Sequence, residues 1–166
     1  MPSRRPKGRG TAETAERRRN VSENRKAFRD YQLLERVEAG LVLLGTEIKS
    51  IRASRVNLGD AYAQVRDDGA WLYGMHVAAW PGGGPWNHEP LRPRKLLLHK
   101  DQVQKLGRSV GQKGLTLVPV RLYIRDHHAK VELALAKGRR QYDKRQVIIN
   151  RETDREIARA MRSRQG

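Results

Sequence analysis

The sequence has no cysteine, few aromatic residues and no long apolar segment. Its 166 residues include one Phe, three Trp and five Tyr. The lack of cysteine excludes thiol catalysis, cysteine-ligated zinc and disulfide bonds, and it fits a reducing compartment. No run approaches the roughly 18 apolar residues of a membrane-spanning helix, and the first residues lack the apolar stretch of a secretory signal. The sequence therefore predicts a cytoplasmic protein with no membrane association.

Motifs of common catalytic and metal sites are also missing. None of the five histidines belongs to an H-E-x-x-H pattern, and His127 and His128 are adjacent, so they cannot chelate from one face. The glycines at 82–84, and those at 107, 111 and 114, match neither a P-loop nor a dinucleotide fingerprint. We expect no catalytic residue, no metal, no cofactor and no enzyme activity.

Positive charge dominates the composition. Lysine and arginine number 35 against 18 aspartates and glutamates, which gives a formal net charge of +17 and an isoelectric point near 11.0. Residues 1–19 hold seven cations and two acids, and residues 137–166 hold ten cations and four acids. The longer central segment has a similar excess spread more thinly. This imbalance indicates a polyanionic partner, and the charge is densest in the two tails.

The composition divides the chain into three segments. Residues 1–23 have almost no large apolar side chains, so we expect a disordered, flexible basic extension. Residues 24–141 alternate apolar and polar side chains and are long enough to fold alone. Residues 142–166 form a basic tail in which Ile157 and Met161 belong to a narrow apolar stripe. Such a lone helix is marginal in water, so we expect the tail to become helical on binding.

The central segment contains mostly strand patterns. Strands are predicted over residues 31–38, 41–44, 61–66, 70–77, 115–125 and 130–136, short helices over 46–55 and 99–106, and a strand or the start of a helix over 94–98. Ala39-Gly40 and Asp67-Asp68-Gly69 predict turns, and Pro119 predicts an edge position or a bulge. The absence of a βαβ rhythm favours an antiparallel, OB-like β-barrel with short helices. The Gly- and Pro-rich loop Trp80 to Trp86 suggests no role.

Basic residues gather at the ends of predicted elements. The three clusters are Lys49, Arg52 and Arg55; Arg92, Arg94 and Lys95; and Lys137, Arg139 and Arg140. Long side chains there can converge on one phosphate surface. Because aromatic residues are scarce, recognition of folded RNA by shape and backbone fits better than stacking on single-stranded bases. A solvated charged face is the alternative for each cluster. A general RNA chaperone or ribosome-associated cationic protein is the alternative for the chain, and a nuclease is weaker still.

Longer motifs carry a resemblance to a known family. They are Glu38-Ala39-Gly40, Gly45-Thr46-Glu47-Ile48-Lys49-Ser50-Ile51-Arg52, Asn57-Leu58-Gly59-Asp60-Ala61-Tyr62, Asn87-His88-Glu89-Pro90-Leu91-Arg92-Pro93-Arg94-Lys95-Leu96-Leu97-Leu98, Lys113-Gly114-Leu115-Thr116-Leu117-Val118-Pro119, Val131-Glu132-Leu133-Ala134-Leu135-Ala136-Lys137-Gly138 and Tyr142-Asp143-Lys144-Arg145. From Asn24 to about Arg159 the chain resembles small protein B, or SsrA-binding protein, the partner of transfer-messenger RNA (tmRNA) in bacterial ribosome rescue.

The resemblance implies a function and its partners. The barrel would bind the tRNA-like domain of tmRNA at its elbow, and the tail would enter the decoding site and empty mRNA channel of the small ribosomal subunit. There the tail would replace a codon–anticodon pair. The aminoacyl-tRNA elongation factor would be an indirect partner, and we expect a monomer. Glu38 matches an RNA-binding position, with an ion pair to a neighbouring cation as its alternative. Tyr142 matches a position that stacks on ribosomal RNA.

The clusters and the resemblance together give two sets of site residues. The expected RNA-binding residues are Asn24, Tyr31, Glu38, Lys49, Arg52, Arg92, Arg94, Lys95, Lys137, Gly138, Arg139 and Arg140, and the expected decoding-site residues are Tyr142, Asp143, Lys144, Arg145, Ile157 and Met161.

Overall fold

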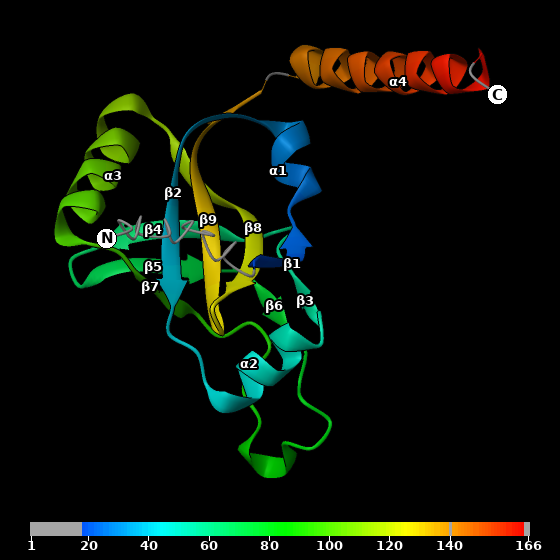
Figure 1. Ribbon diagram of the computed structural model, residues 1–166. Coiled ribbons are helices and arrows are strands. Elements are labelled where there is room, and N and C mark those ends of the chain that lie inside the picture. Colours follow the sequence, from blue (N-terminus) through cyan, green and yellow to red (C-terminus); the bar gives the residue numbers. More distant parts are fainter. Residues whose placement is uncertain (1–17, 140, 165–166) are drawn as a thin grey trace, which may run out of the picture.

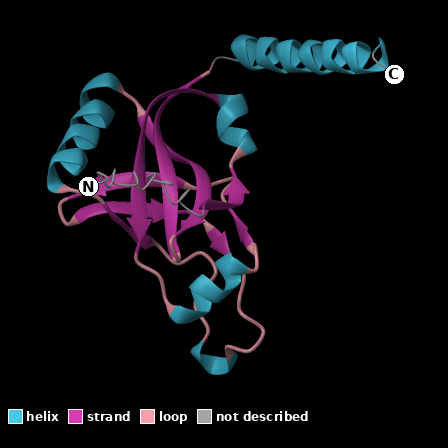
Figure 2. Cartoon of the chain, viewed as in Figure 1, coloured by secondary structure: helices cyan, strands magenta, loops and turns pink. Residues whose placement is uncertain are grey.

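The computed structural model describes residues 18–139 and 141–164, which fold around one antiparallel sheet (Figures 1 and 2). The strands are β1 (Arg18–Glu23), β2 (Tyr31–Leu41), β3 (Val56–Asn57), β4 (Tyr62–Arg66), β5 (Gly69–Tyr73), β6 (His76–Val77), β7 (Arg94–Leu97), β8 (Thr116–Arg125) and β9 (His128–Gly138). The helices are α1 (Arg25–Asp30), α2 (Gly45–Arg52), the 3-10 turn η1 (Gly84–Trp86), α3 (Lys100–Lys113) and α4 (Gln141–Arg164).

The main sheet closes on itself. Its strand order is β1-β8-β4-β5-β7-β2-β9, and β8 also pairs with β9. This last pairing joins the two ends of the run from β8 to β9, so the strands form a ring to which β1 is added along β8. Strands β3 and β6 form a separate pair. The closed antiparallel ring confirms the predicted mainly β, OB-like barrel.

Apolar side chains inside the ring form the core. Fully buried members include Ile51, Leu72, Met75, Val77, Leu122, Val131 and Leu133. Leu122 and Val131 are direct partners across β8 and β9, and each such side chain contributes about 1.5–3 kcal/mol on burial. Helix α1 packs on a smaller cluster that includes Ala27, Val118 and Ala136. The barrel is thus held together by its own strands, and α1 is fixed to one part of its wall.

Residues 18–23 are ordered, which corrects the prediction of disorder for them. They form β1, which pairs antiparallel with β8, so that Arg18 lies opposite Arg125. Backbone hydrogen bonds to an available strand can order a segment that has few apolar side chains. Composition gives no sign of such bonds. Residues 1–17, the rest of the predicted extension, lie outside the described residues.

The predicted turn at Ala39-Gly40 is wrong, because β2 runs without a break to Leu41. Gly40 pairs with Lys130 of β9 on one side and with Leu97 of β7 on the other. A Cβ atom at Gly40 would lie 3.1 Å from Cβ of Leu97. The glycine therefore allows a close approach of two strands and does not reverse the chain.

Several local predictions are confirmed. Helix α2 lies within one residue of the predicted start, and β4 and β5 form the hairpin expected at the Asp-Gly turn, where Gly69 has φ +125°. Strands β8 and β9 form the second hairpin, whose turn holds Asp126 and His127 at positive φ. The pairing of β8 and β9 is irregular between Pro119 and Arg121, as expected for a bulge at this proline.

Helix α3 is longer than predicted. It continues through Gly107, its expected end, and stops before Gly114, which adopts the left-handed conformation at φ +62°. A Cβ atom at Gly107 would lie 3.3 Å from a methyl group of Val65. The glycine thus lets the helix pack closely on β4.

Helix α4 projects away from the barrel (Figure 1). A helix in this segment agrees with the helical propensity of the sequence, and its dependence on binding stays a prediction. Within residues 18–139 and 141–164, no helix is both long enough and apolar enough to cross a membrane.

Candidate nucleic-acid interface

Asn24 joins α1 to the barrel. Its Oδ1 accepts from the Ala27 amide at 3.1 Å, and its Nδ2 donates to the Pro119 carbonyl at 2.9 Å. The Asn24 amide also donates to the carbonyl of Val120 at 2.8 Å. The residue is only 3% exposed, and its side chain is an N-cap that fixes α1 to β8. Contact of Asn24 with RNA stays a prediction.

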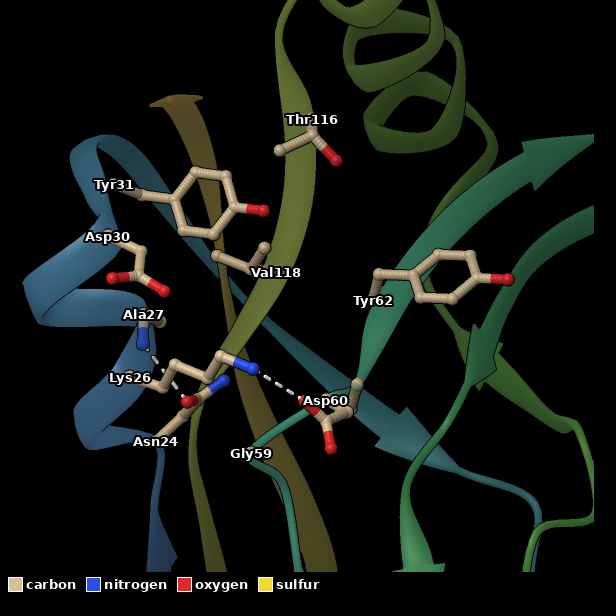
Figure 3. A pocket seen from close by; sticks show the side chains of 11 residues that line it. Asn24, Lys26, Ala27, Asp30, Tyr31, Gly59, Asp60, Tyr62, Thr116 and Val118 are labelled. Carbon is tan, nitrogen blue, oxygen red and sulfur yellow. Dashed lines mark hydrogen bonds and ion pairs between the residues drawn. The ribbon is translucent and has the colours of Figure 1, made fainter. Parts of the chain in front are cut away.

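A pocket lies between α1 and the β3–β4 segment (Figure 3). Its volume is about 280 Å³, and Tyr31 and Tyr62 are among its lining residues. Lys26 and Asp60 form an exposed ion pair across it at 2.7 Å. The ring of Tyr62 also stacks on Tyr73, with centroids 5.5 Å apart. Tyr31 therefore lines the pocket, and Tyr62, which was not among the predicted site residues, lies across the pocket from it (Figure 3).

Glu38 is engaged by two neighbours on the sheet. The hydroxyl of Tyr123 donates to its carboxylate, and both terminal nitrogens of Arg125 lie 3.1 Å from its two oxygens. The guanidinium of Arg18 stacks on the Tyr123 ring, 3.8 Å from the centroid. Burial, together with the bond to Glu38, raises the pKa of Tyr123, so this hydroxyl is a donor throughout the physiological range. The alternative considered for Glu38, an ion pair, is what the structure contains.

Four arginines share this face of the sheet with carboxylates. Arg36 lies 3.2 Å and Arg18 3.9 Å from Glu132. Arg121 lies 3.4 Å from Glu23, and the guanidiniums of Arg36 and Arg121 both approach the ring of Phe28. Together with Arg125, these side chains are 32–41% exposed. Partly exposed pairs of this kind are weak, so the cations remain available to phosphates.

Two of the predicted RNA-binding arginines belong to a buried ion-pair network. Arg94 is fully enclosed, and its Nε donates to Glu47 at 3.0 Å. Arg92 donates to both oxygens of the same carboxylate, at 3.0 and 2.8 Å. Burial alone would raise the pKa of Glu47, but these guanidiniums and the Leu44 amide hold it below its usual value. The guanidinium of Arg94 is therefore engaged inside the fold, and Arg92 shares its carboxylate. Contact of either residue with RNA stays a prediction.

The other predicted cations lie at two ends of the barrel. Lys49 and Arg52 are on α2, whereas Lys137 and Gly138 end β9 and Arg139 follows it, on the side of α4 (Figure 1). The basic clusters therefore do not converge on one small surface. Lys49, Arg52, Lys137 and Gly138 are exposed, and Lys95 and Arg139 are partly exposed. Arg139 has a buried Nε without a hydrogen-bond partner within the described part of the chain. Arg140 lies outside the described residues.

Helix α4 exposes the side chains that the sequence predicted on one stripe. Ile157 and Met161 are 50% and 64% exposed, and Arg145 is exposed as well. Tyr142, Asp143 and Lys144 lie in α4, and their side chains lie outside the described part of the structure. An exposed apolar stripe flanked by arginines can bind a surface that is both apolar and anionic.

The family follows from comparison with known proteins. Residues 21–163 match the family model described as SmpB protein. The chain belongs to the SmpB family. It is 51% identical over 144 residues to the SsrA-binding protein of Carboxydothermus hydrogenoformans, covering 87% of this chain and 97% of that protein. The SsrA-binding protein of Bacillus cereus strain AH820 is 53% identical over 145 residues, covering 87% and 94%.

A solved structure also resembles the chain. Its description is "tmRNA-SmpB: a journey to the center of the bacterial ribosome", and it shares 42% identity with a TM-score of 0.62. The match covers 76% of this chain and 93% of the other. Membership of the SmpB family confirms the family predicted from the motifs, and it agrees with an RNA-binding protein that is not an enzyme.

Sequence reasoning missed much of the SmpB surface. It did not select Arg18, Arg36, Arg121 or Arg125, although alternation along β8 places Arg121, Tyr123 and Arg125 on one face. Arg18 was assigned to a disordered segment. Both ring nitrogens of buried His88 are engaged, and no cluster of potential metal ligands occurs within residues 18–139 and 141–164.

Proposed function

We propose that this chain binds tmRNA through its barrel and serves trans-translation on stalled bacterial ribosomes. The observation that carries the proposal is identity above 50%, over almost the whole length, to proteins named for binding SsrA, the RNA also called tmRNA. The partly exposed arginines of β1, β2 and β8 agree with it, because phosphate contacts dominate the affinity of most RNA-binding proteins.

The RNA-binding surface in this proposal extends along one side of the barrel. Tyr31 offers an aromatic group at the pocket beside α1, and the arginines around Glu132 offer charge. Glu38 acts by holding Arg125 and Tyr123 in place. Further predicted residues extend the surface at both ends, with Lys49 and Arg52 at one end and Lys137, Gly138 and Arg139 at the other. The proposed set also includes Lys95 and Arg140. A tRNA-like elbow is an extended, shape-defined target, which suits contacts spread in this way.

The tail has a separate part in the proposal. Helix α4 enters the decoding site and the empty mRNA channel, where it takes the place of a codon–anticodon pair. Its arginines provide attraction, and Ile157 and Met161 provide apolar contact. Tyr142 stacks on ribosomal RNA, with Asp143, Lys144 and Arg145 completing the entry segment. The chain acts as a monomer in the cytoplasm, and the aminoacyl-tRNA elongation factor is reached through the RNA.

Competition between RNAs tests the binding half of this function. The chain is titrated with the tRNA-like domain of tmRNA in excess unrelated RNA, at several salt concentrations. Specific binding survives the competitor at moderate salt, and this is the expected result. A general RNA chaperone would lose affinity for both RNAs equally as the salt concentration rises, in proportion to the phosphates contacted. That outcome would contradict the proposal.

A further inference from the structure

The loop between β6 and β7 displays one tryptophan at its tip. The loop lies beside α2, at the end of the barrel away from α4 (Figure 1), and the turn η1 forms its far end. Trp86 is 89% exposed, the highest value among the large hydrophobic side chains that the structure describes. Tryptophan buries a large area and is enriched among the residues that contribute most to interfaces, so an indole held in water is a candidate contact.

The side chain of Asn87 closes the loop. Its Oδ1 accepts from the Trp80 amide at 3.1 Å, and its Nδ2 donates to the Trp80 carbonyl at 2.7 Å. The amides of Gly83 and Trp86 continue the turn by donating to the carbonyls of Trp80 and Gly83. A Cβ atom at Gly83 would lie 2.7 Å from the Asn87 amide nitrogen. The glycines of this loop therefore permit a fixed turn.

Buried polar groups hold both ends of the loop. His88 Nε2 donates to the carbonyl of Val77 at 2.9 Å, and Arg94 donates to the carbonyls of Met75 at 2.6 Å and Pro90 at 3.1 Å. The Glu47–Arg94 ion pair thus anchors the segment that carries Trp86. Because the loop is already ordered, little conformational entropy is lost when Trp86 binds a partner.

The helix beside the loop carries exposed cations, while the loop itself carries one exposed acid, Glu89. The Ala78 amide donates to the Arg55 carbonyl at 3.0 Å, and the hydroxyl of Ser50 donates to the Ala78 carbonyl, so the loop starts against α2. This part of the chain also carries Lys49 and Arg52 at its surface. The one acid of α2, Glu47, is enclosed between two guanidiniums. An exposed indole on a loop that starts against a helix with exposed cations suits an RNA partner: the ring stacks on a base while the cations meet phosphates.

We propose that Trp86 stacks on one unpaired base of the RNA that the barrel binds. The inference rests on the proposed function, which brings Lys49 and Arg52 to that RNA. A single indole accepts one base and adds a contact point at the end of the molecule opposite α4. It is consistent with recognition of a folded RNA, because elbows and loops of such RNAs present unstacked bases.

Substitution of the indole tests the stacking. Trp86→Ala should weaken binding to the tRNA-like domain of tmRNA about tenfold, within the range of one base–aromatic contact. Trp86→Phe should keep most of the affinity. The slope of log Kd against log salt should stay unchanged, because no phosphate contact is lost. The matched control is Leu91→Ala, which removes another exposed apolar side chain of the same loop and should have no effect.

Two further measurements test whether the loop conformation positions Trp86 for contact with the RNA. Gly83→Ala leaves Trp86 and every charge in place but forces the Asn87 side chain to move, so it should lose part of the same affinity. RNA should also quench tryptophan emission in the unaltered chain more than in Trp86→Phe.

Three results would overturn the inference: unchanged affinity of Trp86→Ala, an equal loss in Leu91→Ala, or a loss of ribosome binding without loss of RNA affinity. Each leaves the proposed function standing, whereas failure of the unaltered chain to prefer the tRNA-like domain would reject that function.

Discussion

The barrel and α4 use the same cationic residue in two different ways. In the barrel, Arg94 and Arg92 share the buried carboxylate of Glu47. On α4, Arg145 and the arginines that follow it are exposed, beside an exposed apolar stripe. The net charge of the chain does not distinguish the buried arginines of the barrel from the exposed arginines of α4. The difference shows that part of the excess charge maintains the fold, while another part is free to meet an anionic partner.

Removal of the Glu47 carboxylate should have the largest effect on this comparison. Glu47→Ala leaves two guanidiniums without their partner, one of them fully buried, so the free energy of unfolding should fall by about 3–5 kcal/mol. Urea denaturation measures the change. The matched control is Glu35→Ala, which removes an exposed partner of Lys105 and should cost less than about 1 kcal/mol. Equal effects would mean that the buried network does not maintain the barrel.

The same carboxylate should make stability depend on acid. The pKa of Glu47 is lower in the folded chain than its ordinary value of 4.5, so the ion pairs stabilise the fold fully above that value. The stabilisation is lost as the pH falls through the lower, folded pKa. Unfolding followed from pH 7 to pH 2 should show this loss in the unaltered chain and a smaller one in Glu47→Gln.

Truncation of Asn24 should have an intermediate effect. Asn24→Ala removes the cap of α1 and the bond to Pro119, which should lower the free energy of unfolding by about 1–2 kcal/mol. Thermal denaturation and RNA titration below the transition measure the two consequences separately. Because the side chain is buried, affinity measured on folded protein should change little. A large loss of affinity with unchanged stability would show that Asn24 contacts RNA directly.

Glu38 should have the smallest effect on folding, and its influence on RNA should pass through Arg125. Glu38→Gln and Arg125→Ala should each weaken RNA binding a few-fold, and the double variant should bind no more weakly than Arg125→Ala. Titration of the four proteins completes the cycle. Additive losses would instead indicate that the Glu38 carboxylate touches the RNA itself.

Local patterns predicted much of the barrel from sequence. The Asp-Gly turn before β5, the alternation in β8 and β9 and the bulge at Pro119 are each determined by neighbouring residues. The turn at Gly40 was predicted wrongly because a glycine can mark either a turn or a close approach of two strands. Only the nearby side chain of Leu97, which the sequence pattern does not show, distinguishes the two. Strand β1 was missed because its order comes from the edge of β8.

The candidate site was less predictable than the fold. Arg94 and Lys95 are neighbours in sequence, yet alternation along β7 buries the first and leaves the second partly exposed. The carboxylate that captures Arg94 lies 47 positions away, so no local pattern reveals it. The match of Asn24 to a family position similarly did not reveal that its side-chain amide forms hydrogen bonds with Ala27 and Pro119. A family motif therefore identifies residues that matter without separating those that touch RNA from those that hold the surface.

The most direct test removes the tail and measures both activities of the chain. A variant that ends at Tyr142 keeps the barrel and its arginines but lacks the rest of α4. The account predicts that its affinity for the tRNA-like domain of tmRNA stays within a few-fold of the unaltered chain at physiological salt, while tagging of stalled nascent chains is abolished. Parallel loss of RNA affinity and tagging, or tagging at the normal rate, would contradict the division between barrel and tail.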